Sequence, residues 1–251
     1  MFEGCSSLKE ITIPSSVISI GGSAFNKCTS LVNVILPSGI TTISTCTFFG
    51  CTSLANITIP SGVTSIGDGA FDGCIGITSI DLPSSVTTIE TGVFSGCKNL
   101  KNINIPLSIT SIGENAFSNC NSITNIYIPS SVTSVDRLAF FSCDNLTSVV
   151  FSHGTTNIGD MAFAECKSLT SVIISDSVTS IGDKTFVDCS SLKSITIPSS
   201  VVSMGAYVFS NCTSLQTIYI EGHSNSTPSS MDGWFYRWNG SNAKIVFNQK
   251  S

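Results

Sequence analysis

The chain has 251 residues, a mass of 26.3 kDa and a formal net charge of -5, from 11 basic and 16 acidic side chains. Charged residues make up only 11% of it, against roughly 25% in an ordinary soluble domain. So few cations would neutralise few phosphates, which argues against a nucleic-acid-binding protein. Hydrophobic residues reach 41%, enough for a core, and no apolar run is long enough to predict a membrane span.

Cysteines recur along the chain with a strict period. Ten of the 11 are separated by intervals of 23 residues, with no insertion or deletion between them. These ten are Cys5, Cys28, Cys51, Cys74, Cys97, Cys120, Cys143, Cys166, Cys189 and Cys212. A period of roughly 20 to 50 residues is typical of a solenoid or repeat array.

Apolar residues keep the same period, and each unit reads LxxIxIPxSVxxIGxxAFxxC. Polar and apolar residues alternate in the LxxIxI segment, which predicts a short half-buried β-strand. The proline that follows ends the strand, because it has no N–H group to donate to a neighbouring strand. The VxxI segment predicts a second short strand, and AFxxC fits one helical turn, with alanine and cysteine on the same face. Pieces this short are unstable alone, so each unit must bury its apolar side against its neighbours.

Stacked units would form a parallel sheet with neighbouring strands ~4.8 Å apart. An inserted residue would turn an apolar strand face toward solvent, which explains the rigid spacing. The predicted fold is a β-rich α/β solenoid: a parallel sheet on the concave face, a short second strand and one helical turn per repeat on the other side. Nine phenylalanines would form one column, with Phe2 as the same position of a preceding unit: Phe25, Phe48, Phe71, Phe94, Phe117, Phe140, Phe163, Phe186 and Phe209.

The cysteine column is interpreted as free thiols. A metal needs ligands that converge on one point, whereas a ladder spreads them along a line, so we predict no metal and no cofactor. A disulfide needs Cβ atoms ~3.8 Å apart that are directed toward each other. Cysteines stacked in a column would all point in the same direction, so they fit this requirement badly. A buried reduced cysteine behaves as a small hydrophobe. Cys46 lies outside the series and is interpreted as a partly exposed free thiol, with intermolecular pairing as the alternative.

The repeat resembles the leucine-rich repeat family, and most closely the 23-residue subclass found in BspA-like surface proteins and in a Treponema leucine-rich protein. The unit from Leu54 to Cys74 is one example of the motif, and the resemblance covers about residues 1–220. It implies a non-enzymatic module at a cell surface or secreted from the cell. It also implies adhesion to host proteins such as fibronectin and fibrinogen, or to other microbes. That function rests on the resemblance, since a fold alone does not fix one.

One stretch departs from the repeat. Ser152 and Ser175 replace the proline, Thr155 replaces the valine, and His153-Gly154 lies in the same turn. A variable exposed turn explains these changes, and a local binding feature is the alternative. The chain contains no GxSxG, P-loop or HExxH motif, and its second histidine lies three repeats away. We therefore predict no enzyme and no catalytic residue.

The outward face of the predicted sheet holds the candidate binding residues. One outward column is polar, and its neighbour mixes tyrosine, valine and isoleucine with polar residues. Because interface centres are enriched in aromatic residues and poor in charge, we predict a protein partner on this face. Ordinary strand propensity is the alternative explanation. The candidate residues are Asp81, Asn104, Asn125, Tyr127, Val150, Ile173 and Tyr219.

The period ends after Ile220, which predicts an array of about ten repeats over 1–220 and a C-terminal cap over 221–251. Within the cap, an aromatic cluster spans Trp234 to Trp238, and residues 244–247 predict a last strand. A carbohydrate-binding surface on this cluster is one alternative function, and a passive spacer or stalk in a larger surface protein is another. No signal peptide is visible. The chain starts inside a repeat, which predicts either a fragment of a longer protein or a gene product whose neighbour covers that end.

Overall fold

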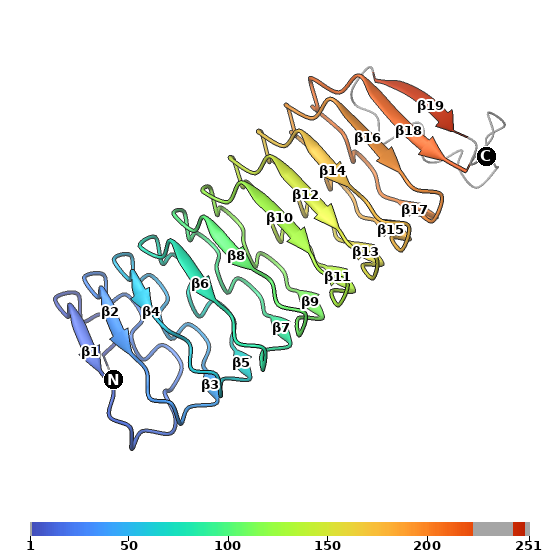
Figure 1. Ribbon diagram of the computed structural model, residues 1–251. Helices are drawn as coiled ribbons and strands as arrows, with labels where there is room; N and C mark the ends of the chain where they lie inside the picture. The colour runs from blue at the N-terminus through green and yellow to red at the C-terminus, as the bar shows by residue number, and fades with distance from the viewer. Residues whose placement is uncertain (1, 223–242, 249–251) are drawn as a thin grey trace.

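The chain winds into an extended rod in which each 23-residue repeat makes one coil (Figure 1). The computed structural model describes residues 2–222 and 243–248. Two rows of short strands run along the rod, which we call the front row and the rear row, and turn segments connect them. Equivalent strands of successive coils lie side by side, so every strand pairing among the described residues is parallel.

The front row comes from the LxxIxI segment of each repeat. Its strands are β1 (Glu10–Thr12), β2 (Asn33–Ile35), β4 (Asn56–Ile57), β6 (Ser79–Asp81), β8 (Asn102–Asn104), β10 (Asn125–Ile128), β12 (Ser148–Phe151), β14 (Ser171–Ile173), β16 (Ser194–Ile197), β18 (Thr217–Glu221) and β19 (Lys244–Asn248). The rear row consists of two-residue strands, which confirms the predicted second strand. They are β3 (Thr42–Ile43), β5 (Ser65–Ile66), β7 (Thr88–Ile89), β9 (Ser111–Ile112), β11 (Ser134–Val135), β13 (Asn157–Ile158), β15 (Ser180–Ile181) and β17 (Ser203–Met204).

The register of the strands reproduces the sequence period. Ile126 lies opposite Val149 and Val149 opposite Val172, each one repeat further along the chain. The rear row is continuous from β7 to β17. The front row divides into the groups β1-β2-β4, β6-β8, β10-β12-β14 and β16-β18-β19. The ladder is therefore interrupted at three places on the front of the rod and unbroken along most of its rear.

The last strand covers the end of the front row. Residues 244–247 were predicted to form a strand, and the structure confirms it as β19, which pairs with β18 over five positions from Thr217↔Lys244 to Glu221↔Asn248. Ala243, just before it, is buried in the core. Residues 223–242 and 249–251 of the predicted cap, which include the cluster from Trp234 to Trp238, lie outside the described residues.

A single stack of phenylalanine rings fills the centre of the rod, as predicted. Consecutive rings from Phe2 to Phe209 have centroids 5.1–5.8 Å apart and interplanar angles of 2–15°. Rings from Phe48 onward are fully buried. Phe151 replaces an aliphatic residue at the end of β12 and meets Phe163 edge-on, with centroids 5.8 Å apart. The stack buries a large apolar area along the length of the array.

The cysteine column lies beside the rings and is reduced, as predicted. All eleven cysteines are free, and Cys46 is half-buried outside the column. From Cys28 to Cys212, each thiol donates to the carbonyl oxygen of the phenylalanine 26 residues earlier, with Sγ···O distances of 2.9–3.2 Å. Burial raises the pKa of these thiols, to about 12 for Cys51, Cys143 and Cys212. Each cysteine thus fills space and also links its own coil to the coil before it.

The predicted helical turn is wrong. None of the described residues is helical, and the segment from glycine to cysteine is a run of turns. Two residues in each of these segments have positive φ, for example Asn115 (φ 56) and Asn119 (φ 59). A right-handed helix cannot pass through a left-handed residue, so the turn never propagates. Gly50, Gly73 and Gly96 precede cysteines at the second of these positions, where glycine relieves the strain.

Alternation of hydrogen bonds explains why this conformation is stable. The N–H groups of Ser23, Phe25 and Lys27 donate to carbonyls of the next coil, at 2.7–3.0 Å. The intervening N–H groups of Ala24, Asn26 and Cys28 donate to carbonyls three residues earlier in their own coil. All six amides are therefore satisfied, half within the coil and half between coils. A helix would have satisfied them without joining the coils together.

Truncation of one ring in the centre of the stack tests the packing. We expect Phe117→Ala to lower the free energy of unfolding by about 3–5 kcal/mol, because it removes a fully buried ring and leaves a cavity between Phe94 and Phe140. Tyr127→Ala, on the surface of the same region, should change it by less than about 0.5 kcal/mol. Urea unfolding compares the two variants, and equal effects would contradict the buried stack.

The thiol column makes the fold sensitive to alkali. Below the ordinary thiol pKa of 9.0, folded and unfolded chains both keep their thiol protons, so stability does not change. Above it, the unfolded chain loses protons that the folded chain retains, and the free energy of unfolding falls as the pH rises toward about 12. Each ionising thiol contributes about 1.4 kcal/mol per pH unit to that fall.

Urea unfolding across this pH range measures the effect. Cys120→Ser keeps a hydroxyl that can donate to the Phe94 carbonyl but does not ionise. The free energy of unfolding of this variant should therefore fall less steeply with pH, by the contribution of one thiol. A free energy of unfolding that stays constant through the range would show that the thiols ionise equally in both states.

Candidate functional site

The outward side chains of the front row form the candidate site. Strand residues alternate between core and solvent, so the residues between the two buried positions of each strand point outward. Tyr127 is 62% exposed and Ile173 is 56% exposed, whereas Val150 between them is half-buried. Tyr127 lies opposite Val150, and Val150 lies opposite Ile173. The structure thus brings these three predicted residues together as one apolar surface, which we call the central patch.

The other predicted residues are spread along the rod. Asp81 and Asn104 are exposed and lie opposite each other on β6 and β8. Asn125 lies on β10, two residues before Tyr127, where its Nδ2 group donates to Thr124 Oγ1 at 3.0 Å. Tyr219 is half-buried on β18, opposite Thr196 and Val246. Only Asn125 therefore borders the central patch directly.

The sequence analysis did not include Ile35 among the candidate binding residues. Ile35 is 53% exposed on β2 and lies in the same outward column as Tyr127 and Ile173, and this position could have identified it. Ile35 lines a groove of about 560 Å³ that also includes Ala55, Thr58 and Asp81. The groove lies where the ladder between β4 and β6 is interrupted. The front row therefore offers a recessed groove of mixed polar and apolar lining near its start and the exposed apolar central patch in its middle.

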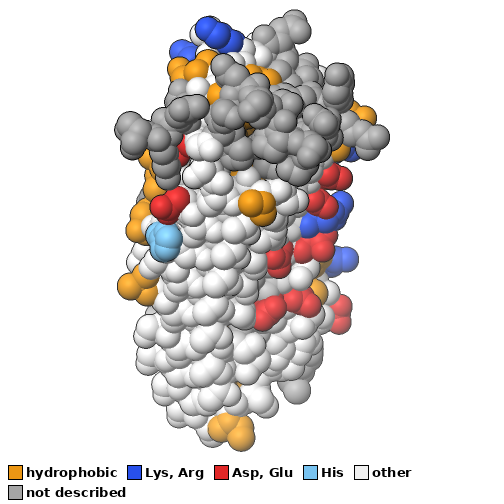
Figure 2. Space-filling model, turned by 90° about the vertical axis from the view of Figure 1, so that its right-hand side faces the viewer, with side chains coloured by type: hydrophobic (Ala, Val, Ile, Leu, Met, Phe, Trp, Pro, Cys, Tyr) orange, Lys and Arg blue, Asp and Glu red, His pale blue; other side chains and the backbone are white. Residues whose placement is uncertain are grey.

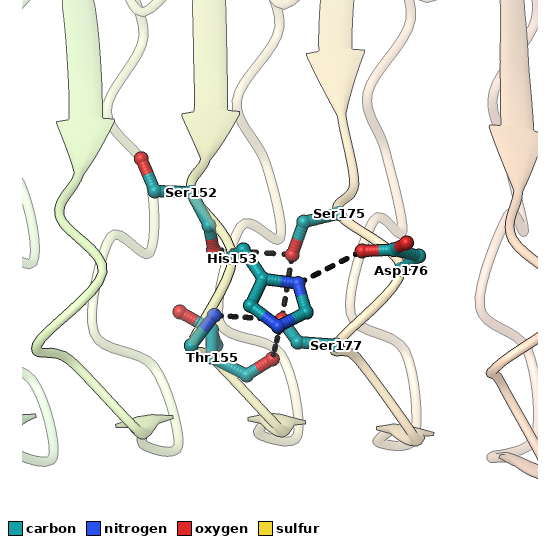
Figure 3. A network of polar contacts seen from close by, with 7 residues as sticks. Ser152, His153, Thr155, Ser175, Asp176 and Ser177 are labelled. Atoms are coloured by element: carbon teal, nitrogen blue, oxygen red, sulfur yellow. Dashed lines mark hydrogen bonds and ion pairs between the residues drawn. The ribbon is translucent and has the colours of Figure 1, made fainter.

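The irregular turns found in the sequence follow the strands of the central patch. His153 follows β12 and Asp176 follows β14, and their side chains point toward each other across adjacent coils (Figure 3). His153 Nδ1 and Asp176 Oδ1 are 2.9 Å apart, and both side chains are largely exposed. In the turns that follow the other front-row strands, most residues at the position of His153 and Asp176 are serine, including Ser84 and Ser130.

Hydroxyl groups hold these two turns together. Ser177 Oγ accepts the N–H of Gly154 at 2.9 Å and donates to the Thr155 carbonyl at 2.8 Å. Ser175 Oγ donates to the Ser152 carbonyl at 3.1 Å, and the two serine hydroxyls are 2.7 Å apart (Figure 3). These hydroxyls are engaged with the backbone, so neither serine is arranged as a nucleophile for His153.

Gly154 is required by this geometry. Its φ is 147°, and a Cβ atom built on it would lie 1.9 Å from the Ser130 carbonyl oxygen. At this point Thr155, which is fully buried, donates its hydroxyl to the Val132 carbonyl at 2.8 Å. The neighbouring coil shows the regular arrangement, a backbone bond from Val132 N–H to the Pro129 carbonyl. The turn after β12 is thus rebuilt around a glycine and a threonine.

Acidic side chains gather elsewhere on the rod. Figure 2 shows a largely uncharged face with charged residues concentrated along one edge. A groove of about 580 Å³ behind the rear row is lined by Glu114, Asp136, Arg137, Asp160 and Asp183. Arg137 pairs with Glu114 at 2.6 Å, and Asp160 and Asp183 accept backbone N–H groups of the next coil. These carboxylates therefore join coils together, and the described residues contain no group of three metal-ligating side chains.

Comparison with known proteins identifies the repeat. The profile of the BspA type leucine-rich repeat region, present in six copies, matches residues 1–123 and 110–231. The chain belongs to the BspA-type leucine-rich repeat family. A search of curated proteins finds no significant match.

Solved structures support the same fold. The leucine-rich repeat protein of Treponema pallidum is 25% identical with a TM-score of 0.55, and the alignment covers 94% of this chain and 87% of that one. The pneumococcal vaccine antigen PcpA is 21% identical with a TM-score of 0.58, over 97% and 69% of the two chains. A leucine-rich repeat protein from Eubacterium ventriosum is 24% identical with a TM-score of 0.55, over 97% and 73%.

Substitution of Gly154 tests the rebuilt turn. Gly154→Ala should lower the free energy of unfolding by about 1–3 kcal/mol, because the new methyl group collides with the Ser130 carbonyl and φ is unfavourable for alanine. Gly21→Ala is the matched control, since a Cβ atom there meets nothing within 4 Å. Thermal unfolding of both variants measures the difference. If they melt together, the turn after β12 does not have the conformation described.

Proposed function

We propose that this BspA-type array is a non-enzymatic interaction module that binds a protein partner through its front row. The central patch supports this proposal best. Tyr127 and Ile173 are large and apolar yet mostly exposed, and Val150 connects them in register. Exposed tyrosine and isoleucine on the two strands that flank β12 gain little stability for the fold and offer a partner apolar area to bury.

The frame of the patch favours binding as well. Strands β10, β12 and β14 are paired with one another, and their inward residues pack on the phenylalanine stack. Side chains held on paired strands lose little conformational entropy when a partner binds. The three strands contain no charged residue, so a partner buries no unpaired charge at the centre of the contact.

We also propose that the module is displayed at a cell surface or secreted, where a host protein would be its partner. Membership of the BspA-type family supports this placement, since its members are generally surface or secreted proteins. Among the described residues, no helix is long and apolar enough to cross a membrane. Adhesion to extracellular-matrix proteins is the form of binding that the family resemblance favours.

A passive spacer is the second candidate function. The rod form in Figure 1, with β1 near one end and β19 near the other, favours this role, because it separates what is attached to its two ends. A spacer needs no particular residue in the central patch, whereas a binding module does. The two functions therefore differ in how they respond to the same substitutions.

A double substitution tests binding through the patch. Immobilised fibronectin and fibrinogen serve as probes, and Tyr127→Ala combined with Ile173→Asp should raise the Kd at least about tenfold. The change removes an aromatic anchor and places a charge at the centre of the contact. Ile18→Asp is the control, because Ile18 is also a large exposed apolar residue but lies outside the front row.

The outcome separates the two functions. Binding that survives the double substitution in a folded variant removes the central patch as the site. Failure of the unaltered chain to bind either protein favours the spacer.

A further inference from the structure

We propose that the groove between β4 and β6 is a second binding site, which takes an arginine side chain from an extended segment of a protein. Asp81 pairs with the guanidinium group, and Ile35 and Ala55 contact the aliphatic stem of the arginine. The groove lies outside the central patch, so this inference goes beyond the proposed function and does not rest on it.

Both strand rows are interrupted between the same two coils. Among the described residues, β4 is not hydrogen-bonded to β6 in the front row, and β5 is not hydrogen-bonded to β7 in the rear row. The turn segments of these coils remain joined, with the Gly50 nitrogen 2.7 Å from the Asp72 carbonyl oxygen. The rings of Phe48 and Phe71 remain stacked, with centroids 5.5 Å apart. The junction is therefore closed at the core and open along its strands.

The interruption provides main-chain acceptors. In the next pair along the row, β6 and β8 bond to each other from Ser79↔Asn102 to Asp81↔Asn104. Carbonyl groups on the facing edges of β4 and β6 have no such partner in the other strand, so they bond water or a ligand. A guanidinium group carries five N–H donors and no acceptor, so it can bond a carboxylate and a carbonyl oxygen at the same time.

The apolar part of the lining suits the stem of a long side chain. Ile35 is 53% exposed, Ala55 is exposed, and Ile57 between β4 and the core is half-buried. An arginine or lysine side chain can lay its methylene groups on such a surface while its charged end reaches a polar group. The groove, of about 560 Å³, has room for one such side chain.

The charge of the lining favours a cation. Asp81 is the only charged residue among those that line the groove, and β2, β4, β6 and β8 contain no lysine or arginine. Lys101 precedes β8 and lies three residues before Asn104, the residue opposite Asp81. The ion pairs found in the described part of the chain involve other carboxylates. A cationic side chain therefore complements the groove, and an acidic one is repelled.

Labelled peptides of about twelve residues test the proposal on the full chain. Each consists of serine, threonine and valine around one central residue, which is arginine, lysine or citrulline. Citrulline keeps the length and the planar end group of arginine but carries no charge. Fluorescence polarisation should give a Kd about threefold lower for arginine than for citrulline, because the pair with Asp81 is exposed to solvent. Lysine should lie between them, since it cannot bond several acceptors in one plane.

Substitutions locate the site. Asp81→Asn should make the arginine and citrulline peptides bind alike, and Ile35→Ser should weaken binding of every peptide. Glu10→Gln is the matched control, because it removes an exposed carboxylate from β1 of the same row, outside the groove, and should keep the preference for arginine. Tyr127→Ala combined with Ile173→Asp should leave the Kd of the arginine peptide unchanged.

Four results would overturn the inference. Equal binding of the arginine and citrulline peptides removes the ion pair, and equal binding of arginine and lysine removes the assignment to a guanidinium group. A preference for arginine that survives Asp81→Asn places the contact elsewhere. Failure of every peptide to bind the unaltered chain removes the site but leaves the central patch untouched, because that patch is tested with fibronectin and fibrinogen.

Discussion

The identical length of every coil is the constraint on which this molecule depends. Only with a fixed period does each phenylalanine ring lie over the next, and only then does each cysteine thiol reach the carbonyl of the preceding phenylalanine. The turn segments add amides that alternate between their own coil and its neighbour. Because so many of its polar and apolar contacts lie in adjacent coils, a single repeat has little to stabilise it alone, and stability belongs to the array.

Because every coil must match its neighbours, residues that point inward are constrained and residues that point outward can vary. The inward columns repeat with almost no variation, whereas outward positions such as Thr58, Asp81 and Tyr127 differ from coil to coil at little cost to packing. Function in such a molecule is therefore encoded by outward variation on a constant frame. The central patch, the groove beside Ile35 and the His153–Asp176 pair are all variations of this kind.

The sequence predicted the structure best at the positions where the 23-residue period shows which residues are buried. The phenylalanine stack, the reduced cysteine column and both rows of strands follow from residue type and spacing, and β19 follows from its alternation. The helical turn was predicted wrongly because apolar spacing does not report the sign of φ, although glycines in the slot of Gly73 and Gly96 hinted at it. The groove beside Ile35 could not be foreseen, since a regular period does not reveal where paired strands separate. The contact between His153 and Asp176 joins two turns that a linear motif search treats as unrelated.

The alternating amides of the turn segments also determine how the rod responds to mechanical load. Their intercoil bonds, like those of both strand rows, run between successive coils along the length of the rod. A pull on the two ends therefore loads the junctions between coils in series, and the junction with the fewest bonds opens first. Tension would be released in steps, each freeing one coil of 23 residues, or about 75 Å of extended chain, while the remaining coils stay folded. An array built this way can yield gradually under shear without losing its whole structure at once.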